Sequence, residues 1–413
     1  MRTPRARAQT PSTGISRRQL LLGGAAAGVG AGIGLAADAW VRSSEQPQAA
    51  PGDDAAPLTG QETIAFFGAT QAGLTVRPQA HSTFVGFDLL PEVDAAGLRR
   101  MMMILSDDAA RLTQGNAALA DSEPELSTIP ARLTITFGFG RGFVERANPR
   151  ATPDWLAPLP AFTIDQLEDR FSEGDLLIEV AADDPLTVSH ALRMLTKDAR
   201  SFARPRWTHR GFRRARGSEP NNTTMRNLFG QVDGTVNLHP DDPDFDRLVI
   251  IRDGWLAGGS SLVIRKIAMD LNEWDRLDRP GREQSVGRTL ANGAPLTGTV
   301  EHDEPDFDAK SPIGFPVIPE FSHIRRARSD NTDERFYRRG YNYEKFGDDG
   351  DEPESGLIFT SFQADVLGQF VPIQRRLDEL DLLNQWTIPV GSSVFAIPPG
   401  CEEGSFIGDT LLQ

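Results

Sequence analysis

The stretch STFVGFDLLPEVDAAGLRRMMMILSDDAARL, residues 82–112, changes from the hydrophobic pattern of a strand to that of a helix. Ser82–Leu89 is rich in residues that favour strands. Val93–Leu112 repeats apolar side chains at helical spacing, as at Leu98 and Met102. A strand that runs directly into an amphipathic helix predicts a sheet with a helix packed on one face.

The same alternation of strands and helices continues along the chain. The first block predicts further strands at Leu133–Gly138 and Leu176–Val180 and a helix at Leu186–Ala199. The second block predicts elements in a similar order, at Ser261–Met269, Asn272–Val286, Gly356–Phe362, Gln369–Leu380 and Ser393–Ile397. This order predicts an α+β fold of two ferredoxin-like halves with antiparallel sheets, residues 61–220 and 221–413. The arginine-rich stretch Arg204–Glu219 is interpreted as a polar connection between them.

The first 39 residues have the pattern of an export signal. Ser16-Arg17-Arg18-Gln19-Leu20-Leu21 is a twin-arginine motif, and an Ala/Gly-rich apolar run follows it. Glycines interrupt this run before it reaches spanning length, which favours cleavage over a membrane anchor. We therefore expect the twin-arginine machinery to deliver the folded protein to the periplasm or the extracellular space. Residues 40–60 are predicted to be a flexible mature N-terminus.

Composition excludes several classes of function. The formal net charge of −15 makes binding to nucleic acid or anionic membranes unfavourable. Cys401 is the only cysteine, so no internal disulfide can form. A thiolate ligand for a metal could therefore come from this residue alone. The absence of Cys-x-x-Cys-His excludes covalent haem attachment through that motif.

The segment NLFGQVDGTVN, residues 227–237, places an acid between two glycines. Locally, the favoured interpretation is a turn in which Asp233 bonds its own backbone. The functional alternative is an acid above a haem that transfers a peroxide proton from one oxygen to the other. Gly234 would then let the backbone approach the flat macrocycle.

His323 differs from the other five histidines because a group of arginines follows it closely. A neutral imidazole suits haem iron as a ligand, and arginines such as Arg328 suit haem carboxylates. Arg338 and Arg339 follow, and an arginine can stabilise the negative charge that develops when peroxide is cleaved. We predict that Arg338 has this role, with Arg339 as the alternative.

Together these motifs resemble the dye-decolourising peroxidases, in the exported branch that includes deferrochelatases. The resemblance extends from about Thr63 to Gly408. Its segments are Phe66–Leu74, Phe137–Gly140, Gly230-x-x-Asp233-Gly234, Gly293–Leu296, Ser361–Asp365 and Gln369–Gln374. It implies a fold of the dimeric α+β barrel type, built from two ferredoxin-like units.

The resemblance also implies one haem b per chain, in the C-terminal half. His323 would ligate the iron, with Asp233 and Arg338 on the other face, where hydrogen peroxide reacts. Small organic donors such as dyes or phenols would supply electrons. The predicted contacts of the haem are Gly234, Thr235, Val236 and Arg328. Asp365 is our candidate for the carboxylate that accepts the second ring proton of His323, and a turn acid is an equal alternative.

Three functions remain open from the sequence. The first is peroxidase activity, the second is release of iron from haem with the porphyrin intact, and the third is exported haem binding without turnover. A surface manganese site in the acidic loops Asp303–Asp308 and Asp348–Glu354 has weak support. A homodimer or larger homo-oligomer is expected from the resemblance alone.

Overall fold

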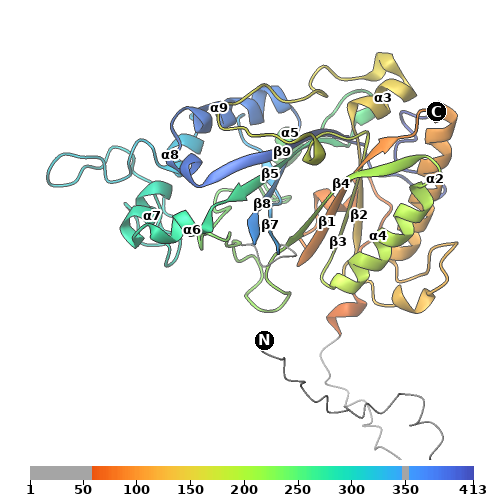
Figure 1. Cartoon of the computed structure of the whole chain (residues 1–413), viewed down its shortest axis with the longest axis horizontal. Helices are drawn as coiled ribbons and strands as arrows, with labels where there is room; N and C mark the ends of the chain where they lie inside the picture. Colours follow the sequence, from red (N-terminus) through yellow and green to blue (C-terminus); the bar gives the residue numbers. More distant parts are fainter. Residues whose placement is uncertain (1–57, 347–352) are drawn as a thin grey trace, which may run out of the picture. The chain divides into compact units, whose positions relative to one another are not determined.

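The computed structural model describes residues 58–346 and 353–413, which build a mixed α and β fold around one antiparallel sheet (Figure 1). The predicted signal peptide, and most of the predicted flexible N-terminus, lie outside these residues. In the described part of the chain, no helix combines the length and apolar character needed to cross a bilayer.

The first half of the sheet contains four strands in the order β2-β3-β1-β4. Their bounds are β1 His81–Leu89, β2 Thr134–Phe139, β3 Leu176–Ala182 and β4 Ala203–Phe212. The helices of this half are α2 Ala95–Thr113, α3 Arg141–Ala147 and α4 Pro185–Ala199, and α2 and α4 pack beside this sheet (Figure 1). Since β1 and β3 are the central strands of the four, this is the strand order of a ferredoxin-like unit.

The second half repeats this arrangement, with β9 and β8 on the two sides of β5 and β7 beyond β8. Its strands are β5 Ser260–Met269, β6 Tyr337–Arg338, β7 Tyr341–Lys345, β8 Glu354–Gln363 and β9 Thr387–Ile397. Its helices are α5 Phe245–Val249, α6 Leu271–Arg276, α7 Arg279–Val286, α8 His323–Ala327, a π-helical turn Val366–Phe370 and α9 Val371–Leu380. The two-residue strand β6 pairs with β8.

The two halves join edge to edge and close into a barrel. The junctions are short, Phe139 to Ala396 between β2 and β9 and Phe212 to Asn342 between β4 and β7. Alternate residues of each strand face the interior or the outer helices: Phe84 belongs to the interior cluster, whereas Val85 packs in the cluster with α2 and α4. The predicted fold class is therefore confirmed.

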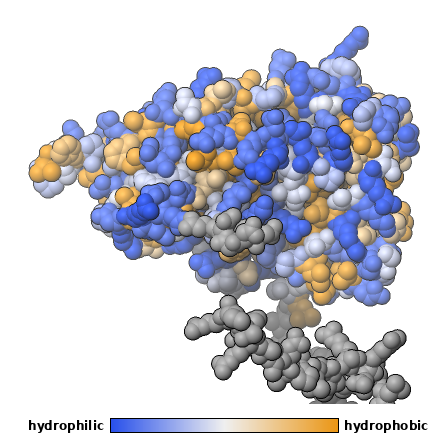
Figure 2. All heavy atoms as spheres, viewed as in Figure 1, coloured by the Kyte–Doolittle hydropathy of each residue, from blue (hydrophilic) through white to orange (hydrophobic). Residues whose placement is uncertain are grey.

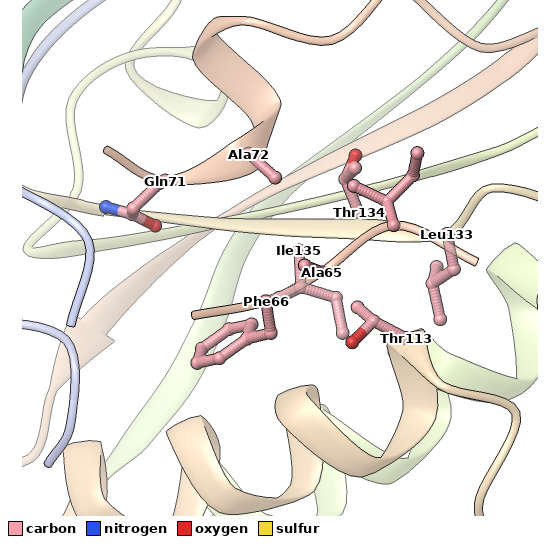
Figure 3. Close-up of a pocket in the computed structure, with 9 residues that line it drawn as sticks. Ala65, Phe66, Gln71, Ala72, Thr113, Leu133, Thr134 and Ile135 are labelled. Atoms are coloured by element: carbon pink, nitrogen blue, oxygen red, sulfur yellow. The ribbon is translucent and has the colours of Figure 1, made fainter. Parts of the chain in front are cut away.

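The glycine- and glutamine-containing segment before β1 has a structural role. The Gln71 side chain donates to the carbonyls of Phe137 and Pro398 (3.0 Å each) and accepts from the Phe137 amide (2.8 Å). A Cβ on Gly73 would lie 1.9 Å from Thr136 Oγ1, so this close approach requires glycine. The cavity beside Gln71 has a volume of only about 10 Å³, too small for an organic ligand (Figure 3).

The interpretation of Arg204–Glu219 as a connection is wrong for its first part, which is strand β4. Trp207 and His209 on this strand face inward and are buried, while the arginines of the strand, Arg204, Arg206 and Arg210, are exposed. The strand pairs with β1 along its length. The arginines and Pro205 hid a half-buried strand pattern, because only alternate residues show it.

Two predicted helices also differ in detail. The helix expected at Asn272–Val286 is divided into α6 and α7, because Asp278 caps α7 by accepting from the Gly281 amide and Pro280 occupies its first turn. The helix expected at Gln369–Leu380 begins at Val371, directly after the π-helical turn.

The face shown in Figure 2 is mainly hydrophilic, in keeping with the acidic composition. The long loop between α7 and α8 extends beyond the helices at the left of Figure 1. Its residues Ile313 and Phe315 are exposed, by 80% and 68%.

Candidate active site

A cavity of about 590 Å³ lies in the C-terminal half of the chain. The apolar side chains that line it include Phe229, Phe307, Leu357, Phe359, Phe370 and Leu377. The predicted site residues Asp233, Gly234, Thr235, Val236, His323, Arg328 and Arg338 all lie among its lining residues. The fold therefore brings together side chains from three separate parts of the sequence.

Asp233 lies on a loop that is fixed by its own backbone and by Asn227. The Asp233 amide donates to the carbonyl of Met225 (2.8 Å), and Arg226 forms an isolated β-bridge with Val232. Asn227, rather than Asp233, caps the turn, because its Oδ1 accepts from the amides of Phe229 (3.1 Å) and Gln231 (3.2 Å). The favoured local interpretation of Asp233 as a turn acid is therefore wrong.

The carboxylate of Asp233 instead meets Arg338. Arg338 Nη1 donates to Asp233 Oδ1 at 3.1 Å, and the two side chains remain 26% and 18% exposed. Gly234 has a φ of 125°, a conformation that residues with a side chain rarely adopt. The backbone conformation next to Asp233 therefore requires glycine. The pair thus forms part of the cavity wall and still faces its open space.

Strand alternation separates Arg338 from Arg339. Arg338 lines the cavity, whereas Arg339 is almost fully buried and donates to the carbonyl of Val76, the Tyr337 hydroxyl (3.3 Å) and Gln79 Oε1 (3.4 Å). Of the two arginines, only Arg338 is therefore placed to act on a ligand in the cavity.

His323 is the first residue of α8, and its side chain is 34% exposed. Its Nδ1 lies 2.6 Å from Oδ2 of Asp381, whose side chain is 4% exposed. Burial opposes protonation of the ring, but the charge and hydrogen bond of Asp381 raise the pKa of His323 above its usual value. Nε2 has no hydrogen-bond partner among the described residues, so one ring nitrogen remains available to a ligand.

The prediction that Asp365 accepts the ring proton of His323 is wrong. Asp365 caps the π-helical turn, where Oδ1 accepts from the amides of Leu367 and Gly368 (3.0 Å each). Asp381 takes the expected role from the end of α9, and its Oδ1 also accepts from the Leu383 amide (3.0 Å). A second hydrogen bond of this kind fixes the carboxylate that orients the ring.

The remaining predicted residues occupy the same cavity. Thr235 Oγ1 donates to Glu301 Oε1 (3.0 Å), and Val236 is exposed. Arg328 lines the cavity and forms an ion pair with Glu304. Arg335, which we did not single out from the sequence, also lines it.

Two other histidines have partners of their own, and most of the acidic loop Asp348–Glu354, considered for manganese, lies outside the described residues. Buried His190 lies 2.8 Å from Asp121, and His209 stacks on Trp207 with ring centroids 4.5 Å apart. Burial, with the charge of Lys266, lowers the pKa of His209 to about 4. Among residues 58–346 and 353–413 there is no group of three or more His, Cys, Asp or Glu side chains suited to a metal.

Comparisons with known proteins identify the family of the chain. Residues 71–213 match the family model described as Dyp-type peroxidase, N-terminal, and residues 224–402 match Dyp-type peroxidase, C-terminal. The chain therefore belongs to the Dyp-type peroxidase family, a family of haem peroxidases, and the resemblance noted in the sequence is confirmed.

Individual relatives support the same assignment. The chain is 35% identical to a dye-decolorizing peroxidase of Thermobifida fusca, over 98% of this chain and 99% of the relative. It is 32% identical to a deferrochelatase of Escherichia coli O157:H7, over 96% and 97% of the two chains. The crystal structure of a DyP-type peroxidase from Cellulomonas bogoriensis superposes with a TM-score of 0.83 at 48% identity, covering 86% of this chain and 100% of that chain.

Proposed function

We propose that this protein reduces hydrogen peroxide at a haem b held by His323, with Asp233 and Arg338 acting on the peroxide. The observation that carries the proposal is the shared cavity, in which a free imidazole nitrogen and a carboxylate–guanidinium pair face the same space. Dyes, phenols or similar small molecules are the proposed electron donors.

The cavity fits a haem in its chemistry. Its phenylalanine and leucine side chains suit the faces of a macrocycle, and His323 Nε2 suits ferric iron. Arg328 and Arg335 also line the cavity and suit the haem carboxylates. When bound, haem would supply the redox-active iron through which the oxidising power of peroxide reaches the electron donors.

The residues of the chain would then share the work of proton transfer and charge stabilisation. Asp233 would take the proton from one oxygen of the peroxide and return it to the other, departing oxygen. Arg338, 3.1 Å from Asp233, stabilises the negative charge that develops on the departing oxygen. Asp381 keeps the Nδ1 proton of His323 directed toward itself, which leaves Nε2 for the iron.

Substitution of the two peroxide-facing residues tests this mechanism. In haem-loaded protein, we expect Asp233→Asn and Arg338→Leu each to slow the reaction with peroxide by about a hundredfold or more. Stopped-flow absorbance at the Soret band measures this rate. Unchanged rates in both variants would show that the proposed residues do not act on peroxide.

Release of iron from haem is a second candidate, favoured by the 32% identity to a deferrochelatase across nearly the whole chain. Product analysis separates the two activities: free protoporphyrin indicates iron release, whereas oxidised donor with intact haem indicates peroxidase action. We also propose export by the twin-arginine route, for which the sequence motif at residues 16–21 is the support. Replacing Arg17 and Arg18 by lysine should retain the protein in the cytoplasm.

A further inference from the structure

The side chain of Asn237 forms two reciprocal hydrogen bonds with the backbone of Arg338. Its Nδ2 donates to the Arg338 carbonyl (2.8 Å), and its Oδ1 accepts from the Arg338 amide (2.8 Å). A primary amide paired in this way reproduces the two bonds that a neighbouring strand residue would make. Asn237 therefore acts as a strand partner for one residue only.

Strand β6 needs such a partner because it is short. It consists of Tyr337 and Arg338 alone, and it pairs on one side with Phe362 and Ser361 of β8. The backbone groups of Arg338 on the other side meet Asn237. Among the described strands none lies on this second side, so the side-chain amide of Asn237 supplies the pairing for Arg338 there.

The register of β6 decides which arginine enters the cavity. Tyr337 and Arg339 are buried toward the barrel, and Arg338 between them points to the cavity. Since side chains alternate along a strand, a shift by one residue could turn Arg338 toward the barrel interior and Arg339 toward the cavity. The bonds from Asn237 to the amide and carbonyl of Arg338 hold the backbone of this residue at the free edge of β6, with its side chain toward the cavity.

Asn237 also belongs to the loop of the partner acid. The backbone amide of Asn237 donates to the carbonyl of Gly234 (2.9 Å). In the same loop, the carboxylate of Asp233 accepts from the guanidinium of Arg338. The side chain thus joins two segments that are 101 residues apart in the chain. One of these segments carries the acid and the other carries the cation.

We propose that Asn237 is a positioning residue that holds the Arg338 guanidinium beside the Asp233 carboxylate. The proposal rests on the proposed function, in which this pair acts on peroxide. Asn237 lines the cavity, but its side-chain amide is hydrogen-bonded to the backbone of Arg338. Asn237 therefore influences the reaction with peroxide through the position of Arg338. Displacement of a catalytic group by about 1 Å can slow a reaction by roughly a hundredfold.

Two variants of Asn237 test the proposal in haem-loaded protein. Asn237→Ala removes both bonds, while Asn237→Asp retains an acceptor for the Arg338 amide and loses the donor to the carbonyl. We expect amide hydrogen exchange at Arg338 to accelerate strongly in the alanine variant and less in the aspartate variant. Asn148→Ala is the matched control, because the Asn148 side chain accepts from the Arg150 amide in the N-terminal half. Unchanged exchange at Arg338 in Asn237→Ala would overturn the proposal.

A double-mutant cycle tests the link to function. We expect Asn237→Ala to slow the reaction with peroxide by about ten- to a hundredfold, and to have almost no further effect in the Arg338→Leu background. An equal loss in both backgrounds would show that Asn237 acts independently of Arg338, and would overturn the proposal. If Arg338→Leu alone leaves the rate unchanged, the proposed function fails, whereas exchange at Arg338 still decides whether Asn237 holds the strand.

Discussion

The contact between His323 and Asp381 predicts a specific effect on the bound iron. Asp381→Asn keeps the size of the side chain and an oxygen that can accept the Nδ1 proton, but it removes the charge. The wild-type bond is short, 2.6 Å, and the carboxylate is 4% exposed. A hydrogen bond to a charged group contributes about 1.5–3 kcal/mol, and a neutral one about 0.5–1.5 kcal/mol. The variant should therefore weaken the support of the ring by about 1–1.5 kcal/mol.

This loss falls mainly on ferric iron, because the negative charge behind the imidazole stabilises the oxidised metal more than the reduced one. An energy of about 1–1.5 kcal/mol corresponds to roughly five- to tenfold in affinity. For a one-electron couple this is a rise of roughly 40 to 60 mV in the ferric/ferrous potential. Spectroelectrochemical titration of the loaded protein measures the shift, and transfer of haem to an apoglobin acceptor measures the weakened binding.

Asp365→Asn is the matched control for this measurement. Asp365 belongs to the same region of the chain but caps the π-helical turn and makes no contact with His323. We expect the ferric/ferrous potential of the Asp365→Asn variant to stay at the wild-type value. A potential unchanged in Asp381→Asn, or a shift of equal size in Asp365→Asn, would refute the assignment of Asp381 as the carboxylate that orients the iron ligand.

Three other predictions concern the ligand, the loop and the effect of pH. His323→Ala should lose the ferric spectrum of an imidazole-ligated haem, and restoration by added imidazole would support ligation; an unchanged Soret band would contradict it. Gly234→Ala should destabilise the fold by about 1–3 kcal/mol in urea denaturation, because φ at this position is 125°. Burial and a hydrogen bond with Asp108 raise the pKa of Asp198 to about 7, so the folded state holds this proton more tightly than the unfolded chain. Stability is then lost as the pH rises from about 4 to about 7. Asp198→Asn should have a higher Tm than wild type at pH 8 and a similar Tm near pH 4, and equal values at pH 8 would show that no such cost exists.

The sequence predicted the elements whose apolar residues follow one period without interruption. Strand β3 and helix α4 are such elements, and the structure places them within a few residues of the expected bounds. Strand β4 was not predicted, because its outward face carries arginines. The alternation of the inward residues Trp207, His209 and Gly211 was hidden among them. The division of α6 from α7 depends on Asp278 and Pro280, a cap signal inside an otherwise continuous helical pattern.

Some residues of the candidate site could be predicted from short local motifs, whereas others depend on contacts between distant parts of the sequence. Asp233, His323 and Arg338 could be found because each lies in a short motif with few substitutes. Asp381 could not be found in this way, since it lies 58 residues from His323. The residues around Asp381 resemble those at the end of any ordinary helix. Asn237 stands inside the motif of Asp233, but its partner is the backbone of Arg338, and a backbone partner leaves no trace in residue types.

The choice between Arg338 and Arg339 shows why composition alone could not complete the site. Both residues are cations at the same point of the chain, and nothing in their neighbours distinguishes them. The barrel interior decides, because Arg339 is close enough to the buried Glu179 for its charge to lower the pKa of that carboxyl, against the larger upward effect of burial. A guanidinium that serves an interior acid cannot also serve a ligand in the cavity. With Arg339 committed to the interior, strand alternation directs Arg338 to Asp233, and the barrel core thereby selects the arginine that faces the cavity.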